Sequence, residues 1–154
     1  MRTNRSGLKL VSQPEPLAAG QVSTDVVSDD DFRIAAAWRD TLRTFMSASK
    51  VILKQASVTP HQYQALLAIR TSDPEHRLTM GELAGALQVR HNSAVTLINK
   101  LASRGLVKRM PSQEDRRVVH LLLTPKGEIT LRKLVAAHRR ELDVVSPVLR
   151  DVLP

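Results

Sequence analysis

The stretch of sequence that decides the fold is residues 78–127, LTMGELAGALQVRHNSAVTLINKLASRGLVKRMPSQEDRRVVHLLLTPKG. Its first part carries the Thr-Met-Gly-Glu pattern of a capping box, which predicts a short helix over 79–87. A turn is predicted over 88–91. It is followed by a second helix over 92–104, which ends where an Arg-Gly pair favours a left-handed exit. Two short helices joined by a tight turn predict a helix-turn-helix.

The second of these helices has two faces of different character. One face is apolar and is expected to pack inward: Ala94, Leu97, Ile98 and Leu101. The other face is polar and has no acidic side chain: Asn92, Ser93, Thr96, Asn99, Lys100 and Ser103. A polar face is usually only solvated, but amide and hydroxyl groups can hydrogen-bond base edges and phosphates without charge repulsion. We therefore expect this helix to lie in the major groove of duplex DNA.

A β-hairpin is predicted directly after the helix-turn-helix. Its strands are expected over 106–110 and 117–124, and the second run is β-rich and too short to form a separate helix. Basic side chains cluster on this hairpin, namely Lys108, Arg109, Arg116 and Arg117. A basic hairpin beside a helix in the major groove is expected to reach the adjacent minor groove.

Three further helices are predicted around this core. The first opens with a Ser-Asp-Asp-Asp cap and covers about 28–55, and the second begins at a Thr-Pro-His-Gln capping box over 59–62. The third starts at Thr124-Pro125 and carries an apolar stripe. Ser146-Pro147 is expected to break or kink it, and a last turn or short helix is expected over 148–153.

Composition limits the possible classes of protein. A chain of 154 residues with 42% hydrophobic content predicts one domain, and a net charge of +8 favours a polyanionic partner. Residues 78–127 alone carry eight Lys or Arg against three Asp or Glu. Aromatic residues at 3% argue against recognition of single strands by stacking, and the absence of cysteine excludes disulfides and thiol switches. No stretch approaches a membrane span, so we expect a cytoplasmic protein without a membrane partner.

Together these features resemble the MarR (multiple antibiotic resistance regulator) family of bacterial winged-helix transcription factors. The matching residues form five short pieces: Leu66-Leu67-Ala68-Ile69, Gly81-Glu82-Leu83-Ala84, Leu101-Ala102-Ser103-Arg104-Gly105-Leu106-Val107, Asp115-Arg116-Arg117-Val118-Val119 and Leu123-Thr124-Pro125-Lys126-Gly127. Each piece is weak alone, but their order and spacing are specific and cover roughly residues 30–147. The implied fold class is mainly α: a winged helix-turn-helix, with a two-stranded β-wing, whose terminal helices form a dimerisation region.

The resemblance implies a homodimer in which two winged-helix lobes read a palindromic duplex. The expected organisation is an N-terminal dimerisation helix over 28–57, a DNA-binding domain over 58–127 and a C-terminal dimerisation helix over 128–154. Residues 1–27 sustain no helical or strand period, so a disordered tail is expected there. The family generally represses transcription, which predicts a ligand-responsive repressor.

The residues expected to contact DNA lie on the recognition helix and the wing. Asp115 matches the acidic residue that braces the family's wing through an arginine, and Arg116 and Arg117 match the basic pair that enters the minor groove. The complete predicted set is Arg90, His91, Asn92, Ser93, Thr96, Lys100, Arg109, Asp115, Arg116 and Arg117.

The resemblance also implies a small effector, often phenolic or otherwise aromatic, that binds between the lobes and the dimer base and releases DNA. Without cysteine, an organic ligand is expected rather than thiol oxidation. Ring faces, a cation and hydrogen-bonding groups suited to an aromatic acid are offered by Trp38, Arg39, His61 and Tyr63. Each of these side chains also has an ordinary packing or surface explanation.

Two alternatives stay open at this stage. A winged helix can serve as a protein-interaction module without DNA binding, although such a module needs no basic hairpin. An enzyme is not expected, since the sequence has no nucleophile elbow, Gly-rich phosphate loop or paired metal-ligand motif. No cofactor and no metal are therefore expected. The five histidines are scattered singly. His120 and His138 lie in apolar stripes, so each is expected to be buried or to lie near the effector cleft, and a packing role is favoured for both.

Overall fold

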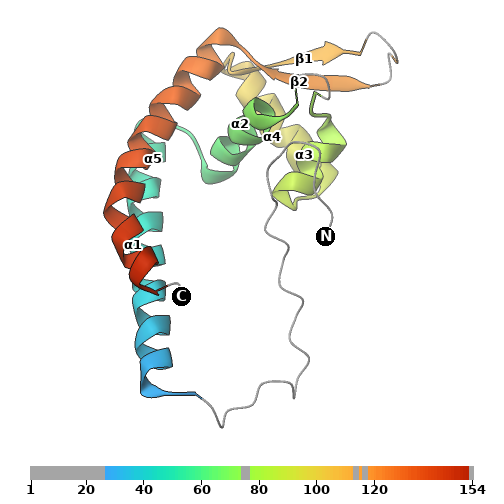
Figure 1. Cartoon of the computed structure of the whole chain (residues 1–154). Coiled ribbons are helices and arrows are strands. Elements are labelled where there is room, and N and C mark those ends of the chain that lie inside the picture. The colour runs from blue at the N-terminus through green and yellow to red at the C-terminus, as the bar shows by residue number, and fades with distance from the viewer. Residues whose placement is uncertain (1–26, 74–76, 113–114, 116–117, 153–154) are drawn as a thin grey trace. The chain divides into compact units, whose positions relative to one another are not determined.

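The computed structural model describes residues 27–73, 77–112, 115 and 118–152, with side chains described as far as 143 in the last helix. The elements, in chain order, are α1 Asp29–Gln55, α2 Pro60–Thr71, α3 Met80–Leu87, α4 His91–Ser103, β1 Val107–Pro111, β2 Val119–Leu123 and α5 Pro125–Val152 (Figure 1). The predicted mainly helical fold with a two-stranded antiparallel wing is confirmed. Residues 1–26 of the predicted tail lie outside the described residues.

The chain divides into two units. One unit covers 50–138 and holds α2, α3, α4, the β1–β2 hairpin and the adjoining ends of α1 and α5. The other holds the remaining parts of α1 and α5, within 1–49 and 139–154. In the part of the chain that the structure describes, no helix is both long and apolar enough to cross a membrane.

Side-chain caps fix where α2 and α3 begin. Thr59 accepts a hydrogen bond from the N–H of Gln62, whose side chain accepts one from the N–H of Thr59, and Pro60 occupies the first turn. Thr79 and Glu82 make the same reciprocal pair at α3. Both capping boxes predicted from the sequence are therefore confirmed, and each satisfies N–H groups that would lack a helical partner.

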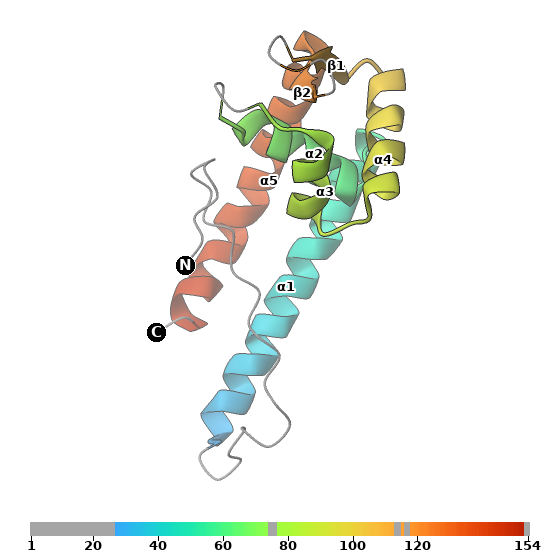
Figure 2. The same cartoon turned by 90° about the vertical axis from the view of Figure 1, so that its right-hand side faces the viewer.

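Apolar faces of α2, α3 and α4 pack side by side with the hairpin in the 50–138 unit (Figure 2). The largest fully buried side chains of this core are Leu66, Leu83, Ile98, Leu101, Leu106 and Leu121. The hairpin pairs Val107 with Leu123 and Pro111 with Val119 in antiparallel register. This core holds the outer face of α4 at the surface.

The hairpin is also bound to the start of α3. The N–H of Leu121 donates to the carbonyl of Leu78, and the backbones of Thr79 and His120 pair as an isolated antiparallel β-bridge. The Nδ1 atom of His120 lies 3.0 Å from the carbonyl oxygen of Arg77. His120 therefore connects the hairpin to the segment before α3 through a polar contact, and its side chain is half-buried.

A second, smaller core joins α1, α2 and α5. Leu53, Val58 and Leu134 are buried together, and Tyr63 packs against them. The Tyr63 ring stacks on the buried His138 ring with centroids 4.6 Å apart and planes 11° from parallel. Burial raises the pKa of the Tyr63 hydroxyl. His138 is thus a packing residue, as expected.

The last helix is longer than the sequence predicted. The sequence predicted that Ser146-Pro147 breaks or kinks this helix. A break followed by a separate short helix over 148–153 does not occur, because the backbone of α5 is helical from Pro125 to Val152, whereas the kink stays a prediction. A proline inside a helix removes one backbone N–H donor and crowds the preceding turn, but the neighbouring hydrogen bonds can hold the helix together.

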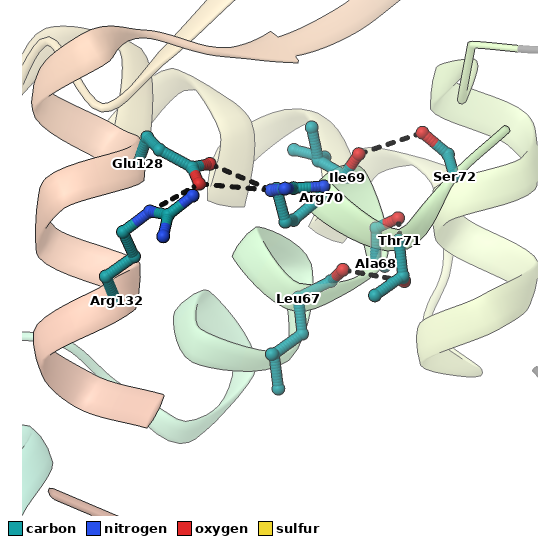
Figure 3. A network of polar contacts seen from close by, with 8 residues as sticks. All are labelled: Leu67, Ala68, Ile69, Arg70, Thr71, Ser72, Glu128 and Arg132. Atoms are coloured by element: carbon teal, nitrogen blue, oxygen red, sulfur yellow. Dashed lines mark hydrogen bonds and ion pairs between the residues drawn. The ribbon is translucent and has the colours of Figure 1, made fainter. Parts of the chain in front are cut away.

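A polar network holds α5 against α2 within the 50–138 unit (Figure 3). Glu128 on α5 accepts from Arg70 of α2 at 3.1 Å and from Arg132, one turn further along α5, at 2.9 Å. Partial burial acts to raise the pKa of the Glu128 carboxyl, but the hydrogen bonds and charges of the two arginines lower it overall.

This network predicts a contribution to stability that depends on pH. Because the pKa of Glu128 is lowered on folding, its ion pairs stabilise the fold above the ordinary glutamate pKa, and their contribution is lost as the pH falls through the lowered value. Glu128→Gln should lower the free energy of unfolding at pH 7 by no more than about 1 kcal/mol, since both arginines are largely exposed. The free energy of unfolding, measured with urea, should fall less between pH 7 and about pH 3 in the variant than in the native protein. An equal fall in both proteins would contradict the role of Glu128 in this network.

Candidate nucleic-acid interface

The helix predicted to read DNA is α4, and its polar side is exposed. Ala94, Ile98 and Leu101 are buried against the core, whereas the side that faces solvent carries Asn92, Ser93, Thr96, Asn99 and Lys100. No acidic residue occurs between His91 and Ser103. The exposed face therefore offers amide, hydroxyl and ammonium groups to a polyanion without introducing a like charge.

The turn before α4 is shorter than predicted. Gln88 ends α3 in the left-handed conformation, with φ of 55°, and its N–H donates to the last carbonyls of that helix. The predicted turn over 88–91 is wrong in its last residue, because α4 begins at His91. The N–H groups of Ser93 and Ala94 bond to the carbonyl of Arg90, which starts the helix without a side-chain cap. Arg90 and His91 are both exposed at this start.

Contacts with the wing and within the helix orient part of this face. The Arg109 guanidinium on β1 donates to Oδ1 of Asn99 at 2.7 Å, so the wing and α4 are joined by their polar side chains. The hydroxyl of Thr96 donates to the carbonyl of Asn92 at 3.0 Å, one turn earlier in the same helix. Arg109, expected from the sequence to contact DNA, thus also positions the wing beside α4.

A hollow of about 700 Å³ opens beside the exposed face of α4. It lies between this helix and the start of α2, and its lining is Thr59, His61, Gln62, Val89, Asn92, Ser93, Thr96, Leu97 and Lys100. Asn92, Ser93, Thr96 and Lys100 were predicted as DNA contacts and are brought together here. His61 was predicted for an effector pocket, and it faces this hollow because it lies on the exposed side of α2. Sequence spacing gave no signal of this proximity, since more than thirty residues separate His61 from Ser93.

The wing places basic side chains beside α4. Lys108 and Arg109 are exposed on β1, and Asp115 is exposed between the strands. The N–H of Asp115 lies 3.5 Å from the hydroxyl oxygen of Ser112. The predicted contacts Arg116 and Arg117 lie outside the described residues.

The four residues predicted for an aromatic effector fall into three places. Trp38 and Arg39 are exposed on the part of α1 that belongs to the unit with the chain termini. Tyr63 and His61 belong to the 50–138 unit, where Tyr63 stacks on His138 and His61 lines the hollow beside α4. Across the described residues, no group of three or more His, Cys, Asp or Glu side chains is placed to hold a metal ion.

Comparison with known proteins agrees with this geometry. The model of the MarR family matches residues 56–118. A transcriptional regulatory protein for the hcr operon of Thauera aromatica is 31% identical over 113 residues, 73% of this chain and 66% of that protein. The solved structure of the transcriptional repressor CouR, bound to a 23-mer DNA duplex, is 31% identical, with a TM-score of 0.61 over 77% of this chain and 84% of that chain.

A more distant structure shows the same fold. AbsC, a MarR family transcriptional regulator from Streptomyces coelicolor, is 22% identical, with a TM-score of 0.64 over 83% of this chain and 84% of that chain. The chain spans 47% to 60% of the length of three further curated relatives. Each of these curated relatives is described as a transcriptional regulator or repressor.

Proposed function

The chain belongs to the MarR family of transcriptional regulators, and we propose that it binds a palindromic DNA duplex as a homodimer and represses transcription. The observation that carries this proposal is the exposed face of α4. Its amide and hydroxyl groups are held outward by a buried apolar face, with cationic side chains at Lys100 and on the wing. This arrangement supports base contacts from the helix and phosphate contacts from the cations.

The function is tested by selecting tight-binding duplexes from a random library and titrating the protein with one of them at fixed salt. The control is a duplex of the same composition in scrambled order. We expect the selected duplex to bind at least about a thousandfold more tightly, because specific DNA-binding proteins reach this ratio. Equal binding of the two duplexes would contradict sequence-dependent recognition, and an absence of binding would favour a winged helix that contacts protein.

Dimerisation is supported by apolar side chains that α1 leaves at the surface. Ile34, Trp38, Leu42 and Met46 recur every four residues, which places them on one side of the helix, and each is between 39% and 46% exposed. A continuous apolar stripe of this kind marks an interaction surface. We therefore propose that α1 contributes to the homodimer interface, together with the C-terminal helix.

Light scattering at micromolar concentration should give twice the chain mass for the native protein. Leu42→Glu should shift this mass toward the monomer, because the interface would have to bury an unpaired carboxylate. Thr44→Glu is the matched control, since Thr44 lies about 200° around the helix from Leu42 and should leave the dimer intact. A native monomer, or equal dissociation of both variants, would contradict the proposed interface.

The proposed role of the wing is electrostatic. Arg116 and Arg117 match the family's minor-groove pair, so Arg117→Ala should weaken binding to all duplexes and reduce the slope of log affinity against log salt by about one for each wing. Arg43→Ala removes the same charge from α1 and serves as the control. An unchanged salt slope in the Arg117 variant would place the phosphate contacts elsewhere.

A small effector that releases DNA is also proposed. Trp38 and Arg39 in one unit, and His61 and Tyr63 in the 50–138 unit, are kept as separate candidates for its contacts. Release requires that the effector bind more tightly to a dimer whose α4 helices are wrongly spaced for the duplex. Salicylate is titrated against the protein–duplex complex at fixed salt, and peroxide is titrated in parallel as the control. We expect salicylate to release DNA. Release by peroxide but not by any small aromatic acid would contradict an organic effector.

A further inference from the structure

A second hollow, of about 410 Å³, shares no lining residue with the one beside α4. It is bounded by the last turn of α1, the segment after α4 and the first half of α5. Its floor is aliphatic, since Leu106 and Leu134 are 2% and 3% exposed and Ile52 and Ala137 lie beside them. A hollow of this size can hold a small organic molecule.

The rim of this second hollow is cationic. Arg104, Lys126 and Lys133 all line it, together with the polar Gln55 and Thr130. None of the described residues that line it is acidic. A cationic rim above an aliphatic floor is complementary to a molecule with an anionic group and an apolar body.

Arg104 occupies a position that joins two helices. It follows the last residue of α4, and its guanidinium donates to the carbonyls of Ala56, at 3.1 Å, and Ser57, just after α1. These carbonyls lie at the C-terminal end of α1, where the helix dipole favours a positive charge. A guanidinium has five N–H donors, so donors remain for an anion after these two bonds.

Lys126 holds the other side of the same junction. Its Nζ donates to the carbonyl of Arg104 at 2.8 Å, and the Thr124 hydroxyl donates to the carbonyl of Gly105 at 2.6 Å. The end of α4 is therefore attached to the start of α5 as well as to α1. An ammonium group has three donors, so Lys126 can also contact an anion.

From this arrangement we infer a binding site for an organic anion, with Lys133, Lys126 and Arg104 facing the anionic group and Leu106 and Leu134 facing the apolar body. The site is separate from Tyr63 and His61, which do not line it. An anion bound to the remaining donors of Arg104 and Lys126 partly neutralises their charge, so the charge-assisted hydrogen bonds that they make to the carbonyls become weaker and the end of α4 is attached less firmly. Its binding therefore lowers DNA affinity, a step that rests on the proposed function.

The binding step is tested with octanoate as the probe and octanamide as its neutral control, by calorimetry on the full chain without DNA. We expect octanoate to bind and octanamide to bind at least about fivefold more weakly. Lys133→Gln should weaken octanoate binding about fivefold, whereas Lys54→Gln, which makes the same charge change outside the hollow, should not. Equal binding of the two probes, or equal affinities of the two lysine variants, would overturn the site.

A second variant tests the site without changing charge. Ala137→Leu places a larger side chain on the floor, so it should weaken octanoate binding at least as strongly as Lys133→Gln, while circular dichroism confirms that the chain is folded. A folded Ala137→Leu protein that binds octanoate with native affinity would overturn the site.

The coupling to DNA is measured with a selected duplex at fixed salt. Saturating octanoate should weaken duplex binding by the native protein about tenfold, within the range usual for allosteric coupling, and should have little effect on Ala137→Leu. Octanoate binding without any change in duplex affinity would overturn the coupling. A chain that binds octanoate as expected but binds no duplex would contradict the proposed function and support the site.

Discussion

Replacing Gly127 with alanine should lower the free energy of unfolding by about 3 kcal/mol or more. A Cβ atom at Gly127 would lie 2.0 Å from the carbonyl oxygen of Leu106 and 2.9 Å from its carbonyl carbon. Both are backbone atoms, so no side-chain rotation can relieve the contact, and Leu106 itself belongs to the core. Urea unfolding followed by circular dichroism should show the loss as a lower midpoint.

The matched control is Gly85→Ala. Gly85 lies in the exposed part of α3, and a Cβ atom there meets nothing within 4 Å. Alanine loses less conformational freedom than glycine in a helix, so this variant should gain up to about 1 kcal/mol. Equal midpoints for the Gly127 and Gly85 variants would show that α5 does not approach Leu106 as closely as described.

The second large effect concerns the exposed face of α4. The triple variant Asn92→Ala, Ser93→Ala and Thr96→Ala should bind the selected duplex about a thousandfold more weakly than the native protein, because each good base contact is worth about 1–3 kcal/mol. These side chains are exposed, and the hydroxyl of Thr96 donates to the carbonyl of Asn92 within the same helix. The unfolding midpoint should therefore change little. Fluorescence anisotropy at fixed salt measures the loss.

A triple variant that removes one amide and two hydroxyl side chains elsewhere supplies the control. Thr44→Ala, Ser47→Ala and Gln64→Ala remove exposed polar side chains from α1 and α2 that do not line the hollow beside α4. Their duplex affinity should stay within about twofold of the native value, because surface substitutions away from an interface have small effects. Similar losses in both triple variants would show that α4 does not carry the base contacts.

Local rules predicted most of the fold. The capping boxes at Thr59 and Thr79 fix helix starts through contacts three residues apart, so the sequence contains all the information needed. The start of α4 was missed by one residue because Arg90 makes no side-chain cap and leaves no such signal. The break expected at Pro147 did not occur, because one lost hydrogen bond does not end a long helix.

Contacts between segments that are distant in the chain could not be predicted from the sequence. The stack of Tyr63 on His138 and the bond between Arg70 and Glu128 each depend on how α5 lies against α2. Periodicity shows that these side chains belong to particular helix faces, but it does not pair one helix with another. From the sequence, Arg104 was likewise identified only as a residue at the end of a helix. Its hydrogen bonds to the carbonyls after α1 depend on how the end of α4 packs against the end of α1.

The candidate site was predictable in part. The exposure of Asn92, Ser93 and Thr96 followed from the apolar period of α4, because a helix that buries one face must expose the other. The base contacts proposed for them stay predictions. The position of His61 beside this face was not predictable, since the two helices meet through the fold rather than through sequence spacing.

The most direct measurement of the central claim, that α4 reads base pairs, is a base-pair scan combined with single variants. Each base pair of the selected duplex is replaced in turn, and the affinity is measured for the native protein, Asn92→Ala and Ser93→Ala at one salt concentration. We predict that each variant loses the native discrimination, about 1–3 kcal/mol, at one particular base pair in each half-site and keeps it elsewhere. Profiles that match the native one at every base pair in both variants would contradict the claim.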